Sequence, residues 1–484
     1  MVSQLKNPNS KTLVMKFGGT SVGTPDAMAQ AVALVRQAQQ DWRRVVVVTS
    51  ALASVTNLLL EGANRAAAGE PQIFRQNESR LRQLHESIAD ALLLSPVLRA
   101  QVKWEIDHLI AEFVNLCQAI NILGEATPRA LDAVAALGER MSVRLLSACL
   151  EAGGVPSQFI EATSLIVTDD HFQNAHPDFA ATTLKTRQVL EPFLAQRIAP
   201  VVTGFIGATP EGITTTLGRG GSDYTAGILG AVLPADEVWI WTDVNGVMTA
   251  DPRLVPQART IPEINYREIA ELAFYGAKVL HPKTIRPVLD AGIGLRICNT
   301  FQPNHPGTRL VADNGLNGKR QDKKGVIKAV TAIRGQRLVT VEGRGMLGVP
   351  GVAARTFSAV ASTGTSVPLI TQASSEQSIC FAVPAEAAER VIQALEQTFA
   401  SELLHDDIDR VWSTPEVAII TVVGAGMMHT PGVAGRIFGA LGNHNVNVIA
   451  IAQGSSEVSI SLVVAGEDAE PAVRAVHDLI LAEA

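Results

Sequence analysis

The 484-residue sequence is poor in cysteine and in charge and lacks long apolar runs, and each shortage excludes a class of protein. Its four cysteines, Cys117, Cys149, Cys298 and Cys380, form no CxxC pair, which argues against a disulfide framework or a cysteine metal site. Charged residues make up 18% of the chain and the net charge is −7, so we expect no nucleic-acid partner. No run of about 18 apolar residues is present, and Met1–Lys11 is polar. We therefore expect a soluble, cytoplasmic protein with no membrane partner.

The hydrophobic fraction of 47% and the chain length predict two or three domains with a substantial core. From Leu13 to about Val311 the pattern alternates strands with helices. Residues 44–49 form a continuous apolar run that is typical of a parallel strand buried on both faces. Residues 58–150 show apolar positions at helical spacing. The sequence thus predicts an α/β catalytic part that contains a long helical region.

The first glycine-rich turn follows a short apolar run at residues 13–15. It reads KFGGTS over residues 16–21 and leads into a helical pattern from Ala27. Glycines between a strand and a helix let backbone N–H groups approach phosphate oxygens, and Lys16 adds a positive charge for a transferring phosphoryl group. A Walker-type loop would need Gly-Lys-Ser/Thr after the glycines, and that string is absent. Taken alone, this turn is equally compatible with an ordinary tight connection.

Two further segments favour phosphate chemistry. Residues 214–225 (TTTLGRGGSDYT) carry a second glycine-rich turn with Arg219, which can hold a carboxylate through two hydrogen bonds, and Asp223, which can position magnesium or a lysine. Residues 238–253 (VWIWTDVNGVMTADPR) form an apolar strand that ends in Thr242 and Asp243, followed by a turn with a further arginine. Two such turns beside an acidic strand end indicate phosphoryl transfer from a magnesium nucleotide.

These strings, together with residues 275–282 (YGAKVLHP), resemble aspartokinase, a family of amino-acid kinases that phosphorylates the side-chain carboxylate of L-aspartate. The resemblance covers nearly the whole chain. It implies an amino-acid-kinase fold, with an open and mostly parallel sheet between helices. It also implies an enzyme that uses ATP and Mg²⁺ to make 4-phospho-L-aspartate, the first step towards lysine, threonine and methionine.

The resemblance also implies roles for individual residues. Lys16 is expected at the β- and γ-phosphates of ATP, and Asp223 is expected to orient Lys16 or magnesium. Arg219 is expected to bind the α-carboxylate of aspartate, and Glu139 its α-ammonium group. No side-chain metal cluster is expected, because magnesium arrives with ATP. The other residues expected at the nucleotide are Phe17, Gly18, Gly19, Thr242, Asp243, Met248 (where relatives place a tyrosine), Arg253, Lys278 and Val279, and those expected at aspartate are Ser50, Thr56, Gly220, Gly221 and Ser222.

The C-terminal part contains an internal repeat. Residues 343, 350 and 372 are echoed at 424, 431 and 453, a constant offset of 81. The residue pattern of each copy predicts a split βαβ unit, which resembles the ACT regulatory domain. The second copy lacks a last strand and an orphan strand over 326–333 precedes the first copy, so we expect this strand to complete the second sheet and to intertwine the two domains. The predicted domains are a catalytic domain over 1–313, a linker over 314–325, a first ACT unit with the leading swapped strand over 326–409, and a second ACT unit over 410–484.

The tail resembles that of aspartokinases that are fused to homoserine dehydrogenase and respond to threonine. No dehydrogenase sequence follows Ala484, so we expect a monofunctional enzyme or a shortened chain. The resemblance implies that Gln372 and Gln453 contact the effector; exposed turn residues are the alternative. A lysine sensor would need an additional carboxylate, whereas the matching positions here are Pro368 and Ile449. We therefore expect threonine as the effector, with lysine as the alternative, and a homodimer or homotetramer formed through the ACT domains.

Two other functions stay open at this stage. Another amino-acid kinase would share the fold but would lack both the KFGGTS string and the repeated tail. A non-catalytic amino-acid sensor could keep the same scaffold. The retention of Lys16, Glu139, Arg219 and Asp223 argues against that second possibility.

Overall fold

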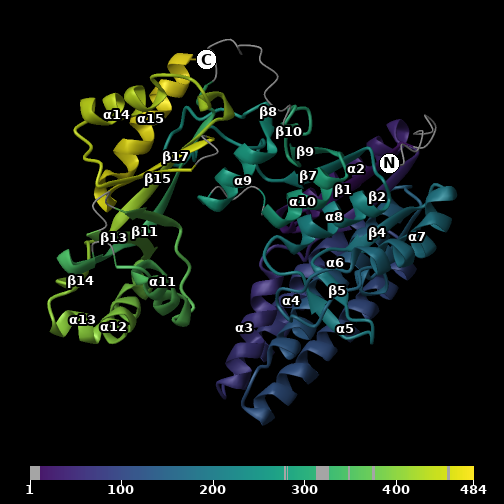
Figure 1. Cartoon of the computed structure of the whole chain (residues 1–484). Helices are drawn as coiled ribbons and strands as arrows, with labels where there is room; N and C mark the ends of the chain where they lie inside the picture. The colour runs from purple at the N-terminus through teal and green to yellow at the C-terminus, as the bar shows by residue number, and fades with distance from the viewer. Residues whose placement is uncertain are drawn as a thin grey trace. The chain divides into compact units, whose positions relative to one another are not determined.

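The computed structural model describes residues 11–276, 280, 282–311, 326–346, 349–372, 377–454 and 458–483, which form two compact units (Figure 1). The first unit contains the residues up to 247 together with 262–266 and 279–312, and the second contains 248–261, 267–278 and the rest of the chain. Residues 248–261 and 267–278 therefore belong to the second unit. The predicted catalytic domain over 1–313 had included both segments. The predicted linker over 314–325 lies outside the described residues.

The first unit is built on an eight-stranded sheet in the order β3-β4-β2-β1-β7-β9-β10-β8. All neighbouring strands pair parallel except β9 and β10, which confirms the predicted open and mostly parallel sheet. The strands are β1 (Thr12–Phe17), β2 (Arg44–Thr49), β3 (Ser157–Ile160), β4 (Ala199–Thr203), β7 (Glu237–Thr242), β8 (Glu263–Asn265), β9 (Gly294–Asn299) and β10 (Thr308–Val311), and a separate hairpin is formed by β5 (Ile206–Ala208) and β6 (Thr214–Thr216).

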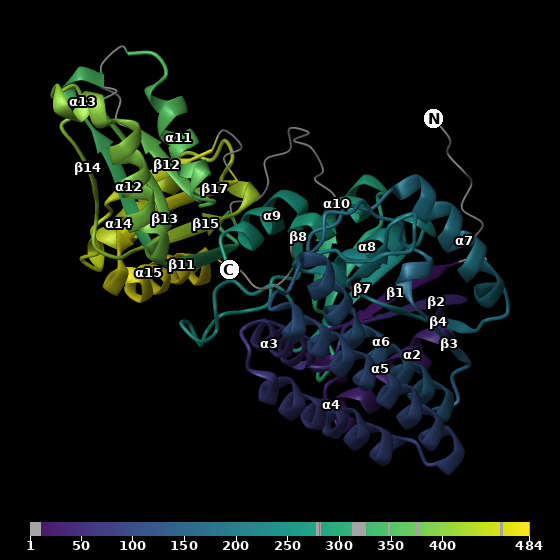
Figure 2. The ribbon, with the colours of Figure 1, turned by 90° about the horizontal axis from the view of Figure 1, so that it is seen from below.

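Helices cover both faces of this sheet. Helices α7, α8 and α10 lie on one face and α2 and α6 on the other, with α3, α4 and α5 packed beyond α6 (Figure 2). Five of the helices, including α5 and α6, have proline as their first residue. The helices are α1 (Gly19–Val22), α2 (Pro25–Asp41), α3 (Val55–Ala67), α4 (Pro71–Leu92), α5 (Pro96–Leu123), α6 (Pro128–Ala152), α7 (Phe179–Ala195), α8 (Gly221–Val232) and α10 (Pro282–Asp290), with a 3₁₀ turn η1 (Ala162–Ser164).

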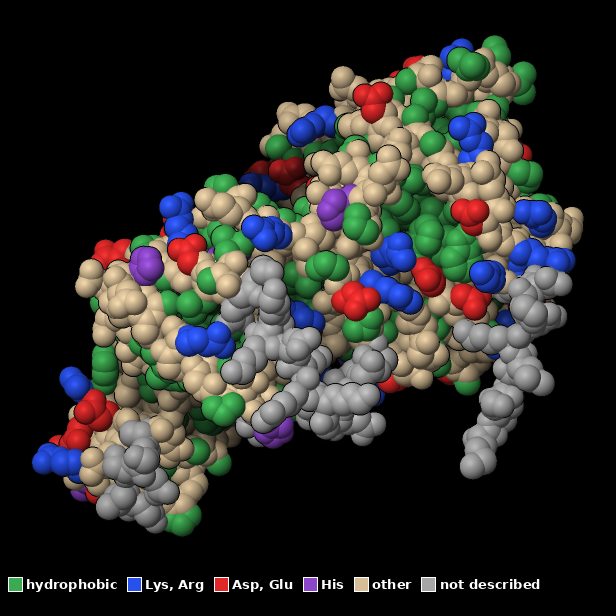
Figure 3. Space-filling view, turned by 90° about the horizontal axis from the view of Figure 1, so that it is seen from above, with side chains coloured by type: hydrophobic (Ala, Val, Ile, Leu, Met, Phe, Trp, Pro, Cys, Tyr) green, Lys and Arg blue, Asp and Glu red, His purple; other side chains and the backbone are tan. Residues whose placement is uncertain are grey.

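Helix α5 is long and apolar enough, by length and composition alone, to cross a membrane, and it is the one such helix among the described residues. Its apolar face, with Ile110, Phe113 and Cys117, packs in the core of the first unit against α4 and α6. This packing accounts for part of the apolar composition of the helix, whereas Val97, Trp104 and Ile122 are exposed. The outer surface is mixed in charge: on the face drawn in Figure 3, Lys and Arg side chains lie among Asp and Glu side chains.

The second unit is a seven-stranded antiparallel sheet with helices from both sequence repeats. The main path is β12-β13-β11-β15-β17-β16, and β14 pairs with β11. The strands are β11 (Ala329–Glu342), β12 (Leu369–Gln372), β13 (Ser378–Pro384), β14 (Arg410–Ser413), β15 (Val417–Val423), β16 (Ala450–Gln453) and β17 (Ser459–Ala465). The helices are α9 (Tyr266–Phe274), α11 (Val352–Ser362), α12 (Ala388–Thr398), α13 (Ala400–Leu404), α14 (Val433–Asn443) and α15 (Ala469–Glu483), with the 3₁₀ turns η2 (Arg344–Met346), η3 (Ala385–Ala387), η4 (Ala425–Met427) and η5 (Gly466–Asp468).

Strand β11 joins the two repeats. Its first part, 329–333, pairs antiparallel with β15 of the second repeat, and its second part, 336–342, pairs with β13 of the first. The ladder shifts register between Ile333 and Gln336, where the strand passes from one repeat to the other. The orphan strand therefore does complete the sheet of the second repeat, and the prediction of two intertwined ACT domains is confirmed.

The swapped part of β11 is expected to stabilise the second repeat directly. Val330 is 2% exposed, lies opposite Val422 of β15 and belongs to the core cluster under α14 and α15. Val330→Ala should lower the stability of this cluster by about 2 kcal/mol, a roughly thirtyfold change in the opening equilibrium. Hydrogen exchange measured by mass spectrometry should then accelerate in β15 and β17. Val349→Ala, at a position that is 52% exposed, is the matched control. Faster exchange confined to β12 and β13 would contradict this role.

Candidate active site

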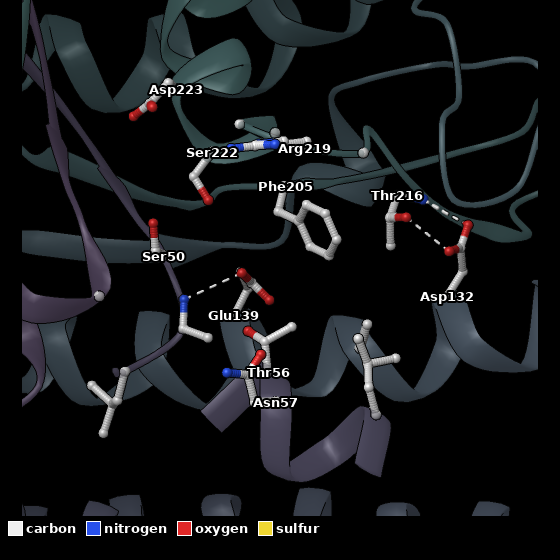
Figure 4. A pocket seen from close by; sticks show the side chains of 18 of the residues that line it. Ser50, Thr56, Asn57, Asp132, Glu139, Phe205, Thr216, Arg219, Ser222 and Asp223 are labelled. Atoms are coloured by element: carbon white, nitrogen blue, oxygen red, sulfur yellow. Dashed lines mark hydrogen bonds between the residues drawn. The ribbon is translucent and has the colours of Figure 1, made fainter. Parts of the chain in front are cut away.

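A cavity of about 590 Å³ opens in the first unit at the carboxyl ends of the central strands. Strands β1, β2 and β7 are parallel neighbours, with Phe17 opposite Thr49 and Trp241, so the residues that follow them meet at one edge of the sheet. This is where open α/β sheets bind ligands. Polar, charged and aromatic side chains line the cavity (Figure 4). They include Lys16, Ser50, Thr56, Asn57, Asp132, Glu139, Phe205, Arg219, Ser222 and Asp223.

The two glycine-rich turns meet through an ion pair. Lys16, near the end of β1, places its Nζ 2.5 Å from Oδ1 of Asp223, which lies in the first turn of α8. The two side chains are only 10% and 16% exposed, so solvent screens their attraction weakly. Of the two partners expected for Asp223, lysine or magnesium, the structure shows the lysine.

The second turn needs glycine at positions where the backbone is left-handed. Gly218 and Gly220 have φ values of +75° and +72°, a region that residues with a Cβ rarely occupy. This backbone brings Arg219 to the cavity wall just before α8 begins at Gly221. Among the described residues, the Arg219 guanidinium has no hydrogen bond or ion pair, which leaves its donors available to a ligand.

Glu139 is a buried carboxylate with one unused oxygen. It lies on α6, is 3% exposed, and its Oε1 accepts a hydrogen bond of 3.2 Å from the backbone N–H of Ala51. Its Oε2 has no hydrogen-bond partner among the described residues. Burial raises the pKa of Glu139 to about 8, although the Ala51 N–H and the positive charge of Lys16 act in the opposite direction. A buried acceptor without a partner is costly, so this oxygen is suited to a cationic donor from a ligand.

Figure 4 shows how these groups face one another. The Arg219 and Glu139 side chains come from opposite walls, and the hydroxyl groups of Ser50 and Ser222 point towards the space between them. Phe205 closes one side of this space with its ring. The cavity thus presents one cation and one carboxylate to the same small ligand, which is the pattern that an α-amino acid requires.

Asp132 and Phe205 are cavity residues that the sequence analysis missed. Asp132 is 1% exposed and accepts hydrogen bonds from the backbone N–H groups of Gln173 and Thr216 and from the Thr216 hydroxyl, at 2.7–3.1 Å. It thereby ties α6 to the loop that contains Gln173 and to the end of β6. The sequence spacing could have predicted Asp132. It precedes Glu139 by seven residues, or two helical turns, so both residues lie on the same face of α6. Nothing local in the sequence marks Phe205.

The residues expected at the nucleotide are only partly assembled in the first unit. Thr242 ends β7 and Asp243 follows it, at the same sheet edge as Lys16, as predicted. The Gly18 N–H, expected to bind phosphate, instead donates to the carbonyl of Trp241 at 3.1 Å. Gly19 is the first residue of α1, so its N–H has no partner within that helix. The ring of Phe17 is fully buried and stacks on Trp241, so its side chain does not reach the cavity.

Other predicted residues lie elsewhere. Met248 and Arg253 belong to the second unit, where Arg253 forms an ion pair with Asp251 at 2.6 Å. Lys278 and Val279 lie outside the described residues. Gln372 and Gln453 end β12 and β16 in the second unit, and both are exposed.

The raised pKa of Glu139 has a consequence for stability. Between its unfolded value of about 4.5 and its folded value of about 8, the folded protein holds a proton that the unfolded chain releases. In the absence of ligand, the unfolding free energy should therefore fall as the pH rises through this range. Glu139→Gln should remove that part of the pH dependence, measured by urea unfolding followed by tryptophan fluorescence from pH 5 to about 8.5. Glu125→Gln, at an exposed carboxylate, is the control. A pH profile unchanged in Glu139→Gln would contradict the raised pKa.

Comparisons with known proteins agree with this geometry. Residues 11–299 match the amino acid kinase family, and residues 339–399 and 420–479 each match an ACT domain. A chloroplastic bifunctional aspartokinase/homoserine dehydrogenase of Daucus carota is 36% identical over 96% of this chain but only 50% of that protein. The chain thus spans about half the length of such bifunctional relatives. Aspartokinase 2 of Arabidopsis thaliana is 31% identical over 96% of this chain and 84% of that protein.

Solved structures show the same similarity in three dimensions. The crystal structure of E. coli aspartokinase III in complex with aspartate and ADP has a TM-score of 0.79 and 32% identity, and covers 97% of this chain and 100% of that one. The complex of the same enzyme with lysine and aspartate has a TM-score of 0.75 and 33% identity, and covers 97% and 99%. With the family matches and this similarity along nearly the whole length, the chain belongs to the amino acid kinase family, as an aspartokinase homologue with two ACT domains.

Proposed function

We propose that this protein transfers the γ-phosphoryl group of MgATP to the side-chain carboxylate of L-aspartate, forming 4-phospho-L-aspartate. The observation that carries the proposal is the placement of the Arg219 guanidinium and the buried Glu139 carboxyl group in one cavity, beside the Lys16–Asp223 ion pair. A related enzyme, E. coli aspartokinase III, has been crystallised with aspartate and ADP. The product would enter the biosynthesis of lysine, threonine and methionine.

Arg219 and Glu139 would fix the orientation of aspartate. The guanidinium can bind the α-carboxylate through two parallel hydrogen bonds, and the free Oε2 of Glu139 can accept one from the α-ammonium group. An ammonium ligand also stabilises the ionised form of Glu139 against the cost of its burial. With both α-groups held, the side-chain carboxylate of the substrate is the group left to attack phosphorus. It is already ionised at neutral pH, so no general base is required.

Lys16 would stabilise the charge that develops on the transferring phosphoryl group. Asp223 holds the Lys16 ammonium in place, so it acts through Lys16. Asp243 offers a carboxylate at the same sheet edge, of the type that Mg²⁺ prefers as a ligand. The magnesium ion arrives with the nucleotide and neutralises charge on its phosphates.

The first test is aspartate-dependent ADP release in a coupled assay. Lys16→Ala should lower kcat by about a hundredfold or more, because the loss of one preorganised charge at a transition state costs roughly 3 kcal/mol. The matched control is Lys185→Ala, an exposed lysine on α7, which should retain wild-type turnover. Near-normal turnover in folded Lys16→Ala, or no aspartate-dependent turnover in the wild type, would overturn the proposed function.

The ACT domains are proposed to bind threonine as a feedback inhibitor. A lysine sensor must compensate a second ammonium group in a partly dry pocket. The two positions where such a carboxylate is expected carry uncharged residues in this chain. They are Pro368, just before β12, and Ile449, just before β16. E. coli aspartokinase III has been crystallised with lysine, which makes lysine the alternative effector. Gln372 and Gln453, exposed at the ends of the same two strands, are the proposed contacts.

Threonine and lysine should therefore differ as inhibitors of the same assay. We expect threonine, titrated from micromolar to millimolar, to suppress turnover, and lysine over the same range to leave it unchanged. Gln453→Ala should weaken inhibition by threonine at least about tenfold, corresponding to the loss of one hydrogen bond to the effector, while preserving turnover without effector. Inhibition by lysine alone would reverse the effector assignment and would leave the proposed kinase activity intact.

A further inference from the structure

Two histidines converge on one carboxylate in the loop between η1 and α7. Asp169 Oδ2 lies 3.1 Å from Nδ1 of His171 and 3.1 Å from Nδ1 of His176. Among the described residues these three side chains form a group whose potential ligand atoms all lie within 4.8 Å of one another. No side-chain metal cluster was expected from the sequence, because magnesium was expected to arrive with ATP, and this group of three residues was not anticipated.

The backbone of the loop holds this arrangement in place. The other oxygen of the same carboxylate, Oδ1, accepts hydrogen bonds from the backbone N–H groups of His171 at 3.3 Å and His176 at 2.9 Å. The backbone N–H of Asp169 in turn donates to the carbonyl of His176 at 3.0 Å. Oδ2 is thereby turned towards both imidazole rings. Such fixing of a carboxylate through its second oxygen is what orients a ligand in a metal site before the ion arrives.

The loop is also anchored to the rest of the first unit. Gln173 donates its backbone N–H to the buried Asp132, and Ala175 donates to the carbonyl of Thr216 in β6. The rings of His171 and His176 themselves are 73% and 60% exposed on the outer side of the loop. An ion could therefore reach the three side chains directly from solvent, while the backbone that carries them stays fixed.

The distances suit a small transition-metal ion. With metal–nitrogen and metal–oxygen bonds of about 2.0–2.2 Å, neighbouring ligands of a four-coordinate ion lie about 3.0–3.5 Å apart, and both Oδ2–Nδ1 distances fall in this range. Two imidazole nitrogens and one carboxylate oxygen are a donor set for Zn²⁺, Co²⁺, Ni²⁺ or Fe²⁺. Mg²⁺ prefers oxygen ligands, so the ion that accompanies ATP is not expected here. On binding, the ion would replace the contacts between the rings and the carboxylate.

We propose that Asp169, His171 and His176 form a binding site for a divalent transition-metal ion, with three protein ligands and water in the remaining positions. The site is separate from the cavity that holds Arg219 and Glu139, and it does not depend on the proposed kinase activity. Its ligand chemistry is that of a surface Zn²⁺ site. The high exposure of the two rings indicates an affinity well below that of a buried structural zinc.

The test uses the full chain without a histidine tag, stripped with a chelator and titrated with Co²⁺. We expect saturable binding of one ion per chain, seen as visible ligand-field absorption, displaced by Zn²⁺ and not by an excess of Mg²⁺. His171→Ala and His176→Ala should each weaken binding about tenfold or more. His108→Ala removes an exposed histidine outside the loop and should leave binding unchanged. Because both rings are exposed, their removal leaves the core intact.

Two outcomes would overturn the site. One is the absence of saturable Co²⁺ or Zn²⁺ binding to the wild-type chain. The other is binding with unchanged affinity in His171→Ala and His176→Ala, which would place the ion elsewhere. Neither outcome bears on aspartate-dependent turnover, so failure of this proposal and failure of the proposed function are distinguishable.

Discussion

The contact between Lys16 and Asp223 is the interaction on which the cavity depends. It joins the end of β1 to the first turn of α8, two elements more than 200 residues apart in sequence, and so brings the two glycine-rich turns to the same edge of the sheet. Because both groups are largely shielded from water, neither charge is well compensated without the other. The pairing therefore fixes the lysine ammonium at the place where a phosphoryl group would arrive, and it also fixes the start of the helix that follows Arg219.

The two ionisable groups on opposite sides of the cavity, Arg219 and Glu139, differ in their exposure to solvent. Arg219 is exposed, so water solvates its guanidinium group while no ligand is bound. Glu139 is buried, and the free enzyme keeps its proton to a pH well above the usual range of a glutamate. A ligand that brings an ammonium group to Oε2 removes this penalty, whereas a ligand without one does not. Under the proposed function, the burial of Glu139 would favour an amino acid over a simple dicarboxylic acid.

The second unit holds more of the chain than its two repeats. The carbonyl of Thr249 accepts a hydrogen bond from the Val330 N–H in the swapped part of β11, and its hydroxyl lies 2.8 Å from Nε2 of His477 on α15. Ala250 and Val255 pack in the same core cluster as these elements. The segment that carries Met248 and Arg253 therefore packs as part of the second unit. A repeat detected in the sequence could not reveal this, because the segment lies outside it.

Local patterns in the sequence determined a large part of this protein. The two glycine-rich turns, the acidic end of β7, the repeat with its offset of 81 and the swapped strand over 326–333 could all be predicted, because each depends on residues close together or on a fixed period. Tertiary structure alone decided that Asp223 contacts Lys16, that the Gly18 N–H is already used by Trp241, and that Asp132 and Phe205 complete the cavity. It also brought His171 and His176 to one carboxylate. These features depend on the distance between side chains that separate elements bring together, and the order of residues along the chain does not specify that distance.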